Sequence, residues 1–264
     1  MASTTAPATA TEQPKVILYW LEQSRSQRIL WLLEELKVDY ELKIYHRDPK
    51  THLAPPELKE IHALGKSPVI SVLAPGATKP IVIAESGFII EYLLDHFGNG
   101  STLLPKRYQE GKEGKVGGET EEWMRFRYFM HYAEGSLMPL MVMSLVVGQI
   151  KGAPVPFFIK PITGRIAGTV NSSFLDPNFQ STYEFLEGQI ASSPDGGKYL
   201  CGPRLTGADI LISFPLIAGR SRTGLTKEKF PKLSEYVDRM EAEPGYKKSV
   251  EKIIEIDGSF SATL

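Results

Sequence analysis

The sequence predicts two structural units, an α/β domain followed by an all-helical domain. Strand-like and helix-like segments alternate through residues 14–100, which is the pattern of an α/β fold. Residues 101–118 are rich in glycine, lysine and glutamate, as expected of a linker between domains. From residue 119 to residue 264 helical periodicity dominates and strand-like runs are rare. Residues 1–13 are small and polar, so we expect a disordered tail there.

The first strand and the first helix follow each other closely. Residues 16–20 are aliphatic and aromatic, which favours a strand. After Ser24 the apolar residues fall at helical spacing, and Ser24 with Gln27 has the spacing of a capping box. The free N–H groups of this helix would then point beyond the end of the strand, where an anion is favoured.

The order of the remaining elements defines the fold of the first domain. Residues 40–45 alternate as a second strand, and the helix before them implies parallel pairing with the first strand. A proline-led helix is expected at 55–61, and residues 69–73 and 81–84 predict an antiparallel hairpin. A helix at 88–97 closes the domain. The order β-α-β-α-β-β-α is the thioredoxin-like arrangement, here without a Cys-x-x-Cys motif.

Helical patterns account for most of the second domain. Thr206 and Asp209 form a capping box before a nearly all-apolar helix, which we expect to be the core of this domain. The sequence does not define the structure of residues 148–172, which are rich in glycine and proline. The last helix should pack near the first domain. Helices are predicted at 119–147, with a bend at Pro139, and at 174–192, 205–218, 230–241 and 245–256.

Composition and charge exclude several classes of protein. A net charge of −1 does not favour binding to nucleic acid. The single cysteine, Cys201, excludes an intrachain disulfide and fits a reducing intracellular compartment; we expect it to be buried and inert. His131 has no second histidine or cysteine at ligand spacing, which argues against a metal site. The apolar run at 137–150 is short and contains Pro139, which favours a buried helix over a membrane span.

The stretch WLEQSRSQRILWLLEEL, residues 20–36, resembles the start of glutathione transferases, in particular the fungal and bacterial branch that includes the microsome-associated fungal enzymes. Two further motifs, Lys66-Ser67-Pro68 and Glu85-Ser86, recur at that family's spacing. The resemblance covers the chain from Val16 to about Glu255, apart from residues 148–172. It implies the two-domain fold, glutathione as co-substrate, no metal, and a homodimer.

Ser24 is the candidate catalytic residue that the resemblance implies, with its hydroxyl donating a hydrogen bond to the glutathione sulfur. A thiol with an ordinary pKa of about 8.5 needs a shift of about one to two units to ionise at neutral pH. A hydrogen bond to the thiolate and a helix N-terminus, about 2–3 kcal/mol together, can supply that shift. The rival is Tyr19, because other branches use a tyrosine at the end of the first strand, although packing in the strand explains Tyr19 more simply.

The family's other glutathione-binding positions fall on short motifs. By resemblance, Ser67 and Pro68 form a cis-proline turn whose backbone pairs with the cysteinyl part of glutathione. Lys66 would pair with the glycine carboxylate, and His52 is a weaker candidate for the same role. Glu85 and Ser86, at a helix start, would bind the γ-glutamyl ammonium and carboxylate. Without the resemblance, Glu85 and Ser86 form an ordinary helix cap.

The second substrate should bind an apolar surface on the long helix of the second domain. The resemblance places part of that helix against the electrophile, so Tyr128, Tyr132 and Met138 are candidates, with Trp20 and Gln23 nearer the sulfur. Core packing is the alternative role for these residues. Asp209 matches the family's structural capping aspartate, and Arg25 and Arg28 are interpreted as solvated or salt-bridged helix residues.

The implied activity is conjugation of the glutathione thiolate to hydrophobic electrophiles, as in detoxification and the stress response, with peroxide reduction as an allied activity. The alternative is a non-catalytic scaffold or regulatory protein of the same fold. We expect a cytoplasmic location. Phe157-Phe158-Ile159 suggests peripheral association with the endoplasmic reticulum, and a contact between subunits is the alternative for this apolar segment.

Overall fold

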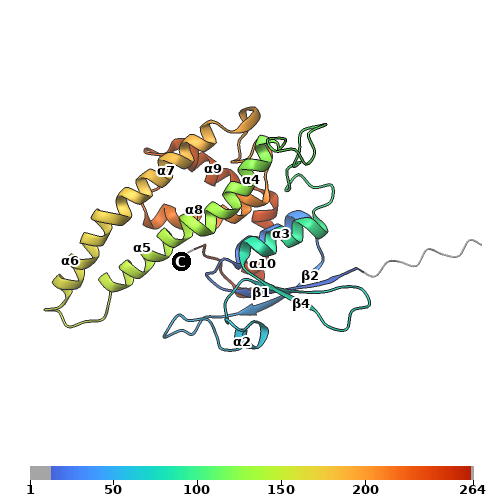
Figure 1. Cartoon of the computed structure of the whole chain (residues 1–264). Coiled ribbons are helices and arrows are strands. Elements are labelled where there is room, and N and C mark those ends of the chain that lie inside the picture. Colours follow the sequence, from blue (N-terminus) through green and yellow to red (C-terminus); the bar gives the residue numbers. More distant parts are fainter. Residues whose placement is uncertain (1–12, 263–264) are drawn as a thin grey trace, which may run out of the picture.

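The computed structural model describes residues 13–262. The predicted disordered tail falls almost entirely outside the described residues. Figure 1 shows a sheet with short helices in the N-terminal part and a larger group of helices in the C-terminal part. The strands are β1 (Lys15–Leu21), β2 (Tyr40–Tyr45), β3 (Val69–Leu73) and β4 (Ile81–Ala84), and the helices of this part are α1 (Ser26–Leu36), α2 (Leu58–Ile61) and α3 (Ser86–Phe97).

The sheet has the strand order β2-β1-β3-β4. Strands β1 and β2 are parallel, with Val16 opposite Tyr40, because α1 carries the chain back across the sheet between them. Strand β3 is antiparallel to both β1 and β4. The parallel pair, the hairpin and the predicted element order are therefore confirmed. Helix α2 is shorter than predicted, because Pro55 and Pro56 lie in the turn before it.

Both faces of the sheet are covered, and β1 distributes its side chains between them with the period of two that a strand requires. Leu18 and Trp20 belong to the main hydrophobic core with α1, α3 and the C-terminal helices. Tyr19 and Leu21 point to the other face and pack with Leu58 of α2. A strand buried on both faces does not show polar alternation in its sequence.

The C-terminal part is built from helices that continue one another through wider turns. The predicted bend at Pro139 is replaced by a π-helical turn just before it, η1, and Pro139 lies in the first turn of α5, where its missing N–H is tolerated. The elements are α4 (Glu121–Tyr132), η1 (Ala133–Leu137), α5 (Met138–Lys151), α6 (Lys160–Val170), η2 (Asn171–Leu175), α7 (Asp176–Ala191), η3 (Pro194–Gly196), α8 (Gly207–Arg222), α9 (Pro231–Ala242) and α10 (Pro244–Asp257).

Residues 148–172 form the end of α5, a turn and α6. These two helices pack side by side and extend beyond the remaining helices at one end of the molecule (Figure 1). Within the described residues, one continuous helical stretch, 121–151, is long and apolar enough to cross a membrane by length and composition. Phe126, Phe129 and Met141 of this stretch belong to the main core, but only 28% of its most apolar window is buried. The buried helix predicted at 137–150 is therefore confirmed only in part, because Val142 and Val146 are exposed.

Helix α8 forms the centre of the C-terminal part and is buried along most of its length. Its predicted capping box is present: Asp209 accepts hydrogen bonds from the Thr206 backbone N–H (2.8 Å) and hydroxyl (2.7 Å) and from the Tyr236 hydroxyl (2.7 Å). The last helix, α10, packs on α1 as predicted, which brings the C-terminal part against the start of the first helix. Cys201 is buried, and burial raises the pKa of its thiol well above the ordinary value.

Candidate active site

Ser24 lies in the turn between β1 and α1, at the end of the sheet that faces the helical part. Its Oγ donates a hydrogen bond to the Leu21 carbonyl (2.7 Å) and accepts one from the Ser26 backbone N–H (3.1 Å). Gln23 has a φ of 46°, a left-handed conformation that turns the chain sharply before Ser24. Ser24 therefore occupies the predicted position beside the N-terminus of α1.

The predicted capping box between Ser24 and Gln27 is not present. The Gln27 side-chain amide donates instead to Ser249 Oγ of α10, at 2.7 Å. Helix α10 packs directly on this face of α1 and supplies the acceptor. A hydrogen bond to a residue more than two hundred positions away in the sequence has therefore replaced the expected hydrogen bond within the first turn of α1.

Three serine hydroxyls form a connected chain at this site. Ser26 Oγ lies 2.8 Å from Ser24 Oγ and is also hydrogen-bonded to Ser67 Oγ, which donates to the Tyr19 carbonyl at 3.0 Å. Ser26 is fully buried. The sequence analysis did not identify it, although the Ser-x-Ser spacing with Ser24 was a usable signal.

Ser67 is held in place by its own backbone. The peptide bond between Ser67 and Pro68 is cis, as the resemblance implies. This turn sets Ser67 beside the end of β1, where its hydroxyl reaches the Tyr19 carbonyl. The rival candidate Tyr19 is 7% exposed, and its hydroxyl lies 3.2 Å from Ser71 Oγ on the α2 side of the sheet, so it is a packed strand residue.

A cleft with a volume of about 190 Å³ opens beside Ser24. The N-terminal part supplies its polar wall and the C-terminal part supplies an apolar one. Helices α5 and α8 thus bring a hydrophobic surface to the serine hydroxyl, which suits a site where a polar group meets an apolar reactant. The cleft is lined by Leu21, Gln23, Ser24, Arg25, Arg47, Ala54, Lys66, Ser67, Met138, Val142 and Phe214.

A smaller hollow adjoins the cleft at the start of α3. Arg25, Lys66 and Ser67 line both spaces, and Glu85 and Ser86 lie at the far side of the smaller one. Ser86 Oγ is buried and has no hydrogen-bond partner within the described chain. An unpartnered buried hydroxyl at a helix N-terminus is a ready donor for a bound carboxylate.

Glu85 has an unusual backbone conformation. Its φ of 73° lies in the left-handed region, which a residue with a Cβ adopts at a cost of about 1–3 kcal/mol. Glu85 and Ser86 thus combine a carboxylate, a free hydroxyl and the end of α3 within one hollow. This set of groups can bind an ammonium and a carboxylate that belong to the same molecule.

Two arginines of α1 share one carboxylate of the helical part. Glu134, in the π-helical turn η1, accepts from Arg25 Nη1 at 2.7 Å and from Arg28 Nη1. Burial by itself would raise the pKa of Glu134, but the two guanidinium groups outweigh it and hold that pKa below the ordinary value. The sequence interpretation of Arg25 and Arg28 as salt-bridged residues is confirmed, although Arg28 is fully buried.

Arg47 is a site residue that the sequence analysis missed. It follows β2, and its guanidinium donates to the carbonyls of Glu22 (3.2 Å), Gln23 (3.0 Å) and His52 (3.0 Å). Arg47 therefore fixes the turn that carries Ser24 and also lines the cleft. Nothing in its local sequence distinguishes it from an ordinary surface arginine.

Of the remaining predicted site residues, some line the cleft and others do not. Met138 lines the cleft, whereas His52 does not and contributes a backbone carbonyl to Arg47. Trp20 was wrongly predicted to line the site: it faces the opposite side of the sheet from Leu21 and is buried in the main core. Tyr128 and Tyr132 were wrongly predicted too, because their rings stack on each other, 5.6 Å apart, and contact Phe185 of α7 instead of the cleft.

One group of described residues has the spacing of a metal site. His46 lies between Glu22 and Asp257, with its Nδ1 3.9 Å from one carboxylate and its Nε2 3.5 Å from the other. Each carboxylate faces a different ring nitrogen, so the imidazole lies between the two acids and links the end of α10 to the segment after β2. His131 is not part of any such group in the described part of the chain.

Comparison with known proteins gives one consistent family. Residues 24–96 match the family model described as glutathione S-transferase, N-terminal domain, and residues 176–244 match the corresponding C-terminal domain model. Glutathione S-transferase 1 of Saccharomyces cerevisiae is 32% identical, with 94% of this chain and 99% of the relative covered. Glutathione S-transferase 3 of Schizosaccharomyces pombe is 28% identical, with 90% and 88% covered.

A solved structure agrees with these relatives. The glutathione S-transferase of Actinobacillus pleuropneumoniae has a TM-score of 0.66 and 30% identity, with 94% of this chain and 95% of the solved chain covered. The match extends over both the sheet and the helical part. The fold of both parts is therefore shared with a solved structure of that name.

Proposed function

This chain belongs to the glutathione S-transferase family, and we propose that its cleft joins the sulfur of glutathione to electrophilic carbon atoms of hydrophobic substrates. The observation that carries the proposal is the pairing of Ser24 with an apolar wall from α5 and α8 in one cleft. Beside this cleft, the unpartnered Ser86 hydroxyl at the start of α3 offers a carboxylate site. Glutathione is the co-substrate.

The groups of glutathione match the groups that surround the cleft. Its γ-glutamyl carboxylate suits Ser86 and the N-terminus of α3, and its ammonium suits Glu85. Lys66, which lines both spaces, suits the glycine carboxylate. The backbone of Ser67, before the cis-proline, would pair with the cysteinyl part, which leaves the sulfur beside Ser24.

Ser24 acts in this proposal as a hydrogen-bond donor and not as a base. Its hydrogen is given to the Leu21 carbonyl in the structure, so the hydroxyl has to rotate to reach a sulfur atom. The thiolate is then stabilised by this hydrogen bond and by the start of α1, and the thiol proton passes to solvent. The thiolate attacks the electrophilic carbon held against the apolar wall, and the substrate's leaving group departs with the bonding electrons.

The test is the Ser24→Ala variant, assayed for conjugation of chlorodinitrobenzene and for the thiolate of bound glutathione by ultraviolet difference titration. We expect turnover to fall by about tenfold to a thousandfold, with the pKa of the bound thiol raised. Binding of glutathione should largely survive. The matched control is Ser71→Ala, which removes a buried serine hydroxyl bonded to Tyr19 on the other face of the sheet.

Two outcomes would contradict the proposal. Unchanged turnover in Ser24→Ala would move the catalytic role to Gln23, which also lines the cleft. Retention of the wild-type protein on glutathione resin without conjugation of any electrophile would favour a non-catalytic scaffold of this fold. The same thiolate can reduce organic hydroperoxides, in which two glutathione thiols become a disulfide while the peroxide becomes an alcohol and water. A hydroperoxide panel on the same variants measures that activity.

A homodimer is part of the proposal. Large apolar side chains are exposed on β4, α3 and α4, where Phe88 is 55% exposed and Met124 is 58% exposed. The ion pair between Arg127 and Glu91 joins α4 to α3, so these apolar residues lie on neighbouring elements. A twofold contact across this face would bury them in both copies.

The location of the protein is also a proposal. We infer a cytoplasmic protein that touches the surface of the endoplasmic reticulum through the turn between α5 and α6. The support is the exposure of Phe157 and Phe158, 84% and 65%, beside the exposed Ile162 of α6. Flotation with phospholipid vesicles tests this: the wild type should float and a Phe157→Ser, Phe158→Ser double variant should not. Equal flotation of both proteins would contradict it.

A further inference from the structure

A histidine and two carboxylates from three separate segments meet at the surface beside the turn between β1 and α1. Glu22 follows β1, His46 follows β2, and Asp257 is the last residue of α10. One ligand atom of each residue lies within 4.8 Å of the ligand atoms of the other two. The packing of α10 on α1 brings the three segments together, so no local pattern in the sequence reveals this group.

The separations within this group are longer than hydrogen bonds. His46 Nδ1 lies 3.9 Å from a Glu22 oxygen and Nε2 lies 3.5 Å from an Asp257 oxygen, whereas N–H···O hydrogen bonds span about 2.7–3.2 Å. Two ligands bound to one zinc ion, each at about 2.0–2.2 Å, lie about 3–3.5 Å apart. The His46 side chain is 57% exposed, so its ring has room to rotate and bring one nitrogen to an ion shared with both acids.

The charges of the group are not balanced. Glu22 and Asp257 are both acidic, and within residues 13–262 neither carboxylate forms an ion pair with a lysine or arginine. A neutral imidazole has one N–H and one lone pair, so it cannot donate to both carboxylates at once. One nitrogen lone pair of a neutral His46 would then face a carboxylate oxygen. A cation bound between the three side chains removes this repulsion.

Glu22 is oriented by its neighbour Arg47. The Arg47 backbone N–H donates to Glu22 Oε1 at 2.6 Å, and Glu22 Oε2 is the oxygen that faces His46. The Arg47 guanidinium also attracts Glu22, but its three nitrogens donate to the backbone carbonyls of Glu22, Gln23 and His52. A hydrogen bond that holds a carboxylate ligand from outside the coordination sphere is typical of metal sites.

We propose that Glu22, His46 and Asp257 bind one divalent transition-metal ion, with zinc as the representative ion. An imidazole nitrogen together with carboxylate oxygens suits Zn²⁺, whereas Mg²⁺ and Ca²⁺ prefer ligand sets made of oxygen alone. Three protein ligands on an exposed surface leave the remaining coordination position to water.

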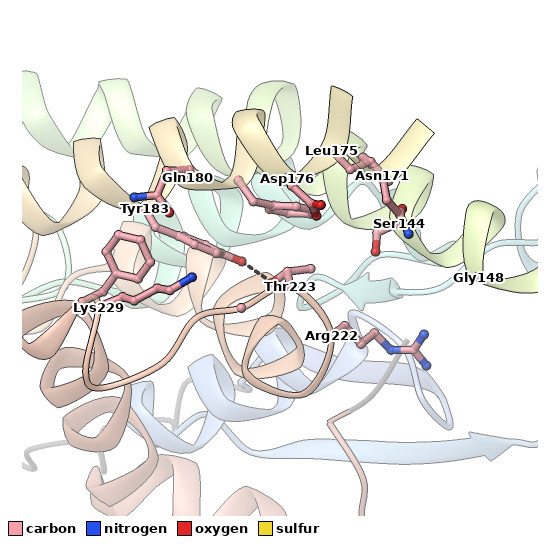
Figure 2. Close-up of a pocket in the computed structure, with 13 residues that line it drawn as sticks. Ser144, Gly148, Asn171, Leu175, Asp176, Gln180, Tyr183, Arg222, Thr223 and Lys229 are labelled. Atoms are coloured by element: carbon pink, nitrogen blue, oxygen red, sulfur yellow. Dashed lines mark hydrogen bonds between the residues drawn. The ribbon is translucent and has the colours of Figure 1, made fainter. Parts of the chain in front are cut away.

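The proposed ion would not touch the reactants. None of its three ligands lines the Ser24 cleft, and none lines the cavity between α5, α7 and the segment after α8 that Figure 2 shows. The ion would instead link the end of α10 and the segment after β2 to a residue two positions before Ser24. Because the three segments come together only in the folded chain, binding should stabilise the folded state.

The experiment is a calorimetric titration of Zn²⁺ into the full chain without an affinity tag, with thermal unfolding in the presence of zinc or of a chelator. We expect one saturable site and a higher Tm with zinc. His46→Gln and Asp257→Asn should each raise the Kd at least about tenfold, since even an outer-shell partner is worth that much, and should abolish the rise in Tm. The matched controls are His131→Gln on α4 and Glu255→Gln on α10, which are exposed residues outside the group.

Three outcomes would overturn the proposal. The first is a wild-type chain that does not bind zinc, and the second is an equal Kd for zinc in His46→Gln and His131→Gln. The third is displacement of zinc by Ca²⁺ at a similar concentration, because the two acids would then attract any divalent ion without the imidazole. Ser24→Ala should bind zinc as the wild type does, so the result is independent of the proposed transferase reaction.

Discussion

Arg28 and Glu134 form an ion pair that joins the first helix of the sheet part to the helical part. Arg28 is fully buried in α1, and its Nη1 donates to a carboxylate oxygen of Glu134 in the π-helical turn η1. Its guanidinium carbon also lies 5.5 Å from the ring centroid of Phe214, which lines the cleft. The same carboxylate holds Arg25, another cleft residue, so one interaction aligns the two walls of the site.

Replacing Glu134 by glutamine should therefore cost stability as well as activity. The change leaves Arg28 buried without a counter-charge, and we expect the free energy of unfolding in urea to fall by about 3–5 kcal/mol. The control is Glu121→Gln, which removes an exposed carboxylate paired with Arg125 on α4 and should cost less than about 1 kcal/mol. A loss for Glu134→Gln no greater than that of the control would contradict the role of this pair.

The same residue predicts how stability changes with pH. The pKa of Glu134 is lower in the folded protein than its ordinary value of 4.5, so its contribution is complete above pH 4.5 and is lost as the pH falls through the folded-state pKa. The difference in unfolding free energy between wild type and Glu134→Gln should thus be constant above pH 4.5 and narrow below it. Chemical unfolding at a series of pH values measures this. If the difference in unfolding free energy between wild type and Glu134→Gln becomes larger at low pH, the prediction is contradicted.

Ser26 should act as a positioning residue for Ser24. The three hydroxyl hydrogens of Ser24, Ser26 and Ser67 cannot serve all four contacts at once, because Ser24 donates to Leu21 and Ser67 donates to Tyr19. Ser26 therefore has the one hydroxyl hydrogen that is not given to a backbone carbonyl, and donating it to Ser24 strengthens the hydrogen bond that Ser24 makes to a sulfur atom. We expect Ser26→Ala to lower kcat about threefold to tenfold and to raise the pKa of bound glutathione, with little change in KM. A change in KM alone would indicate a merely structural role.

Ser86→Ala separates binding from folding. Because the Ser86 hydroxyl is buried and has no hydrogen-bond partner among residues 13–262, its removal should leave the free energy of unfolding unchanged or slightly raise it. Loss of a hydrogen bond to the γ-glutamyl carboxylate should raise KM for glutathione by about tenfold or more. The control is Ser213→Ala, whose hydroxyl donates to the Ile210 carbonyl at 2.7 Å, and which should lose stability without a change in KM. If Ser86→Ala leaves KM unchanged, the hollow at α3 is not the glutamyl site.

The proposed dimer is tested by Phe88→Glu. A charge in the middle of the apolar face of β4, α3 and α4 should convert a dimer into a monomer in sedimentation or light scattering, because a buried unpaired carboxylate costs several kcal/mol. Phe157→Glu places the same charge on the turn between α5 and α6, away from that face, and should remain dimeric. A wild-type protein that is monomeric at assay concentration would refute the dimer.

The residue pattern was sufficient for features that depend on near neighbours in the chain. The order of strands and helices, the capping box of Thr206 and Asp209, and the position of Ser24 at the start of α1 follow from local spacing. The cis peptide before Pro68 was expected only from the family resemblance, since no local rule distinguishes cis from trans there.

Other features depend on how rigid elements pack, which no local pattern records. Both faces of β1 are buried, so the sequence does not indicate which face Trp20 lies on. In the structure Trp20 packs in the main core and does not line the cleft. The Gln27 side chain does not form the expected capping box, because α10 places Ser249 within hydrogen-bond distance of it. The sequence by itself therefore determined the elements and the serine at the reactive helix end. Tertiary packing decided the partners of Arg28 and Gln27 and the walls of the cleft, because these require contacts between segments far apart in the chain.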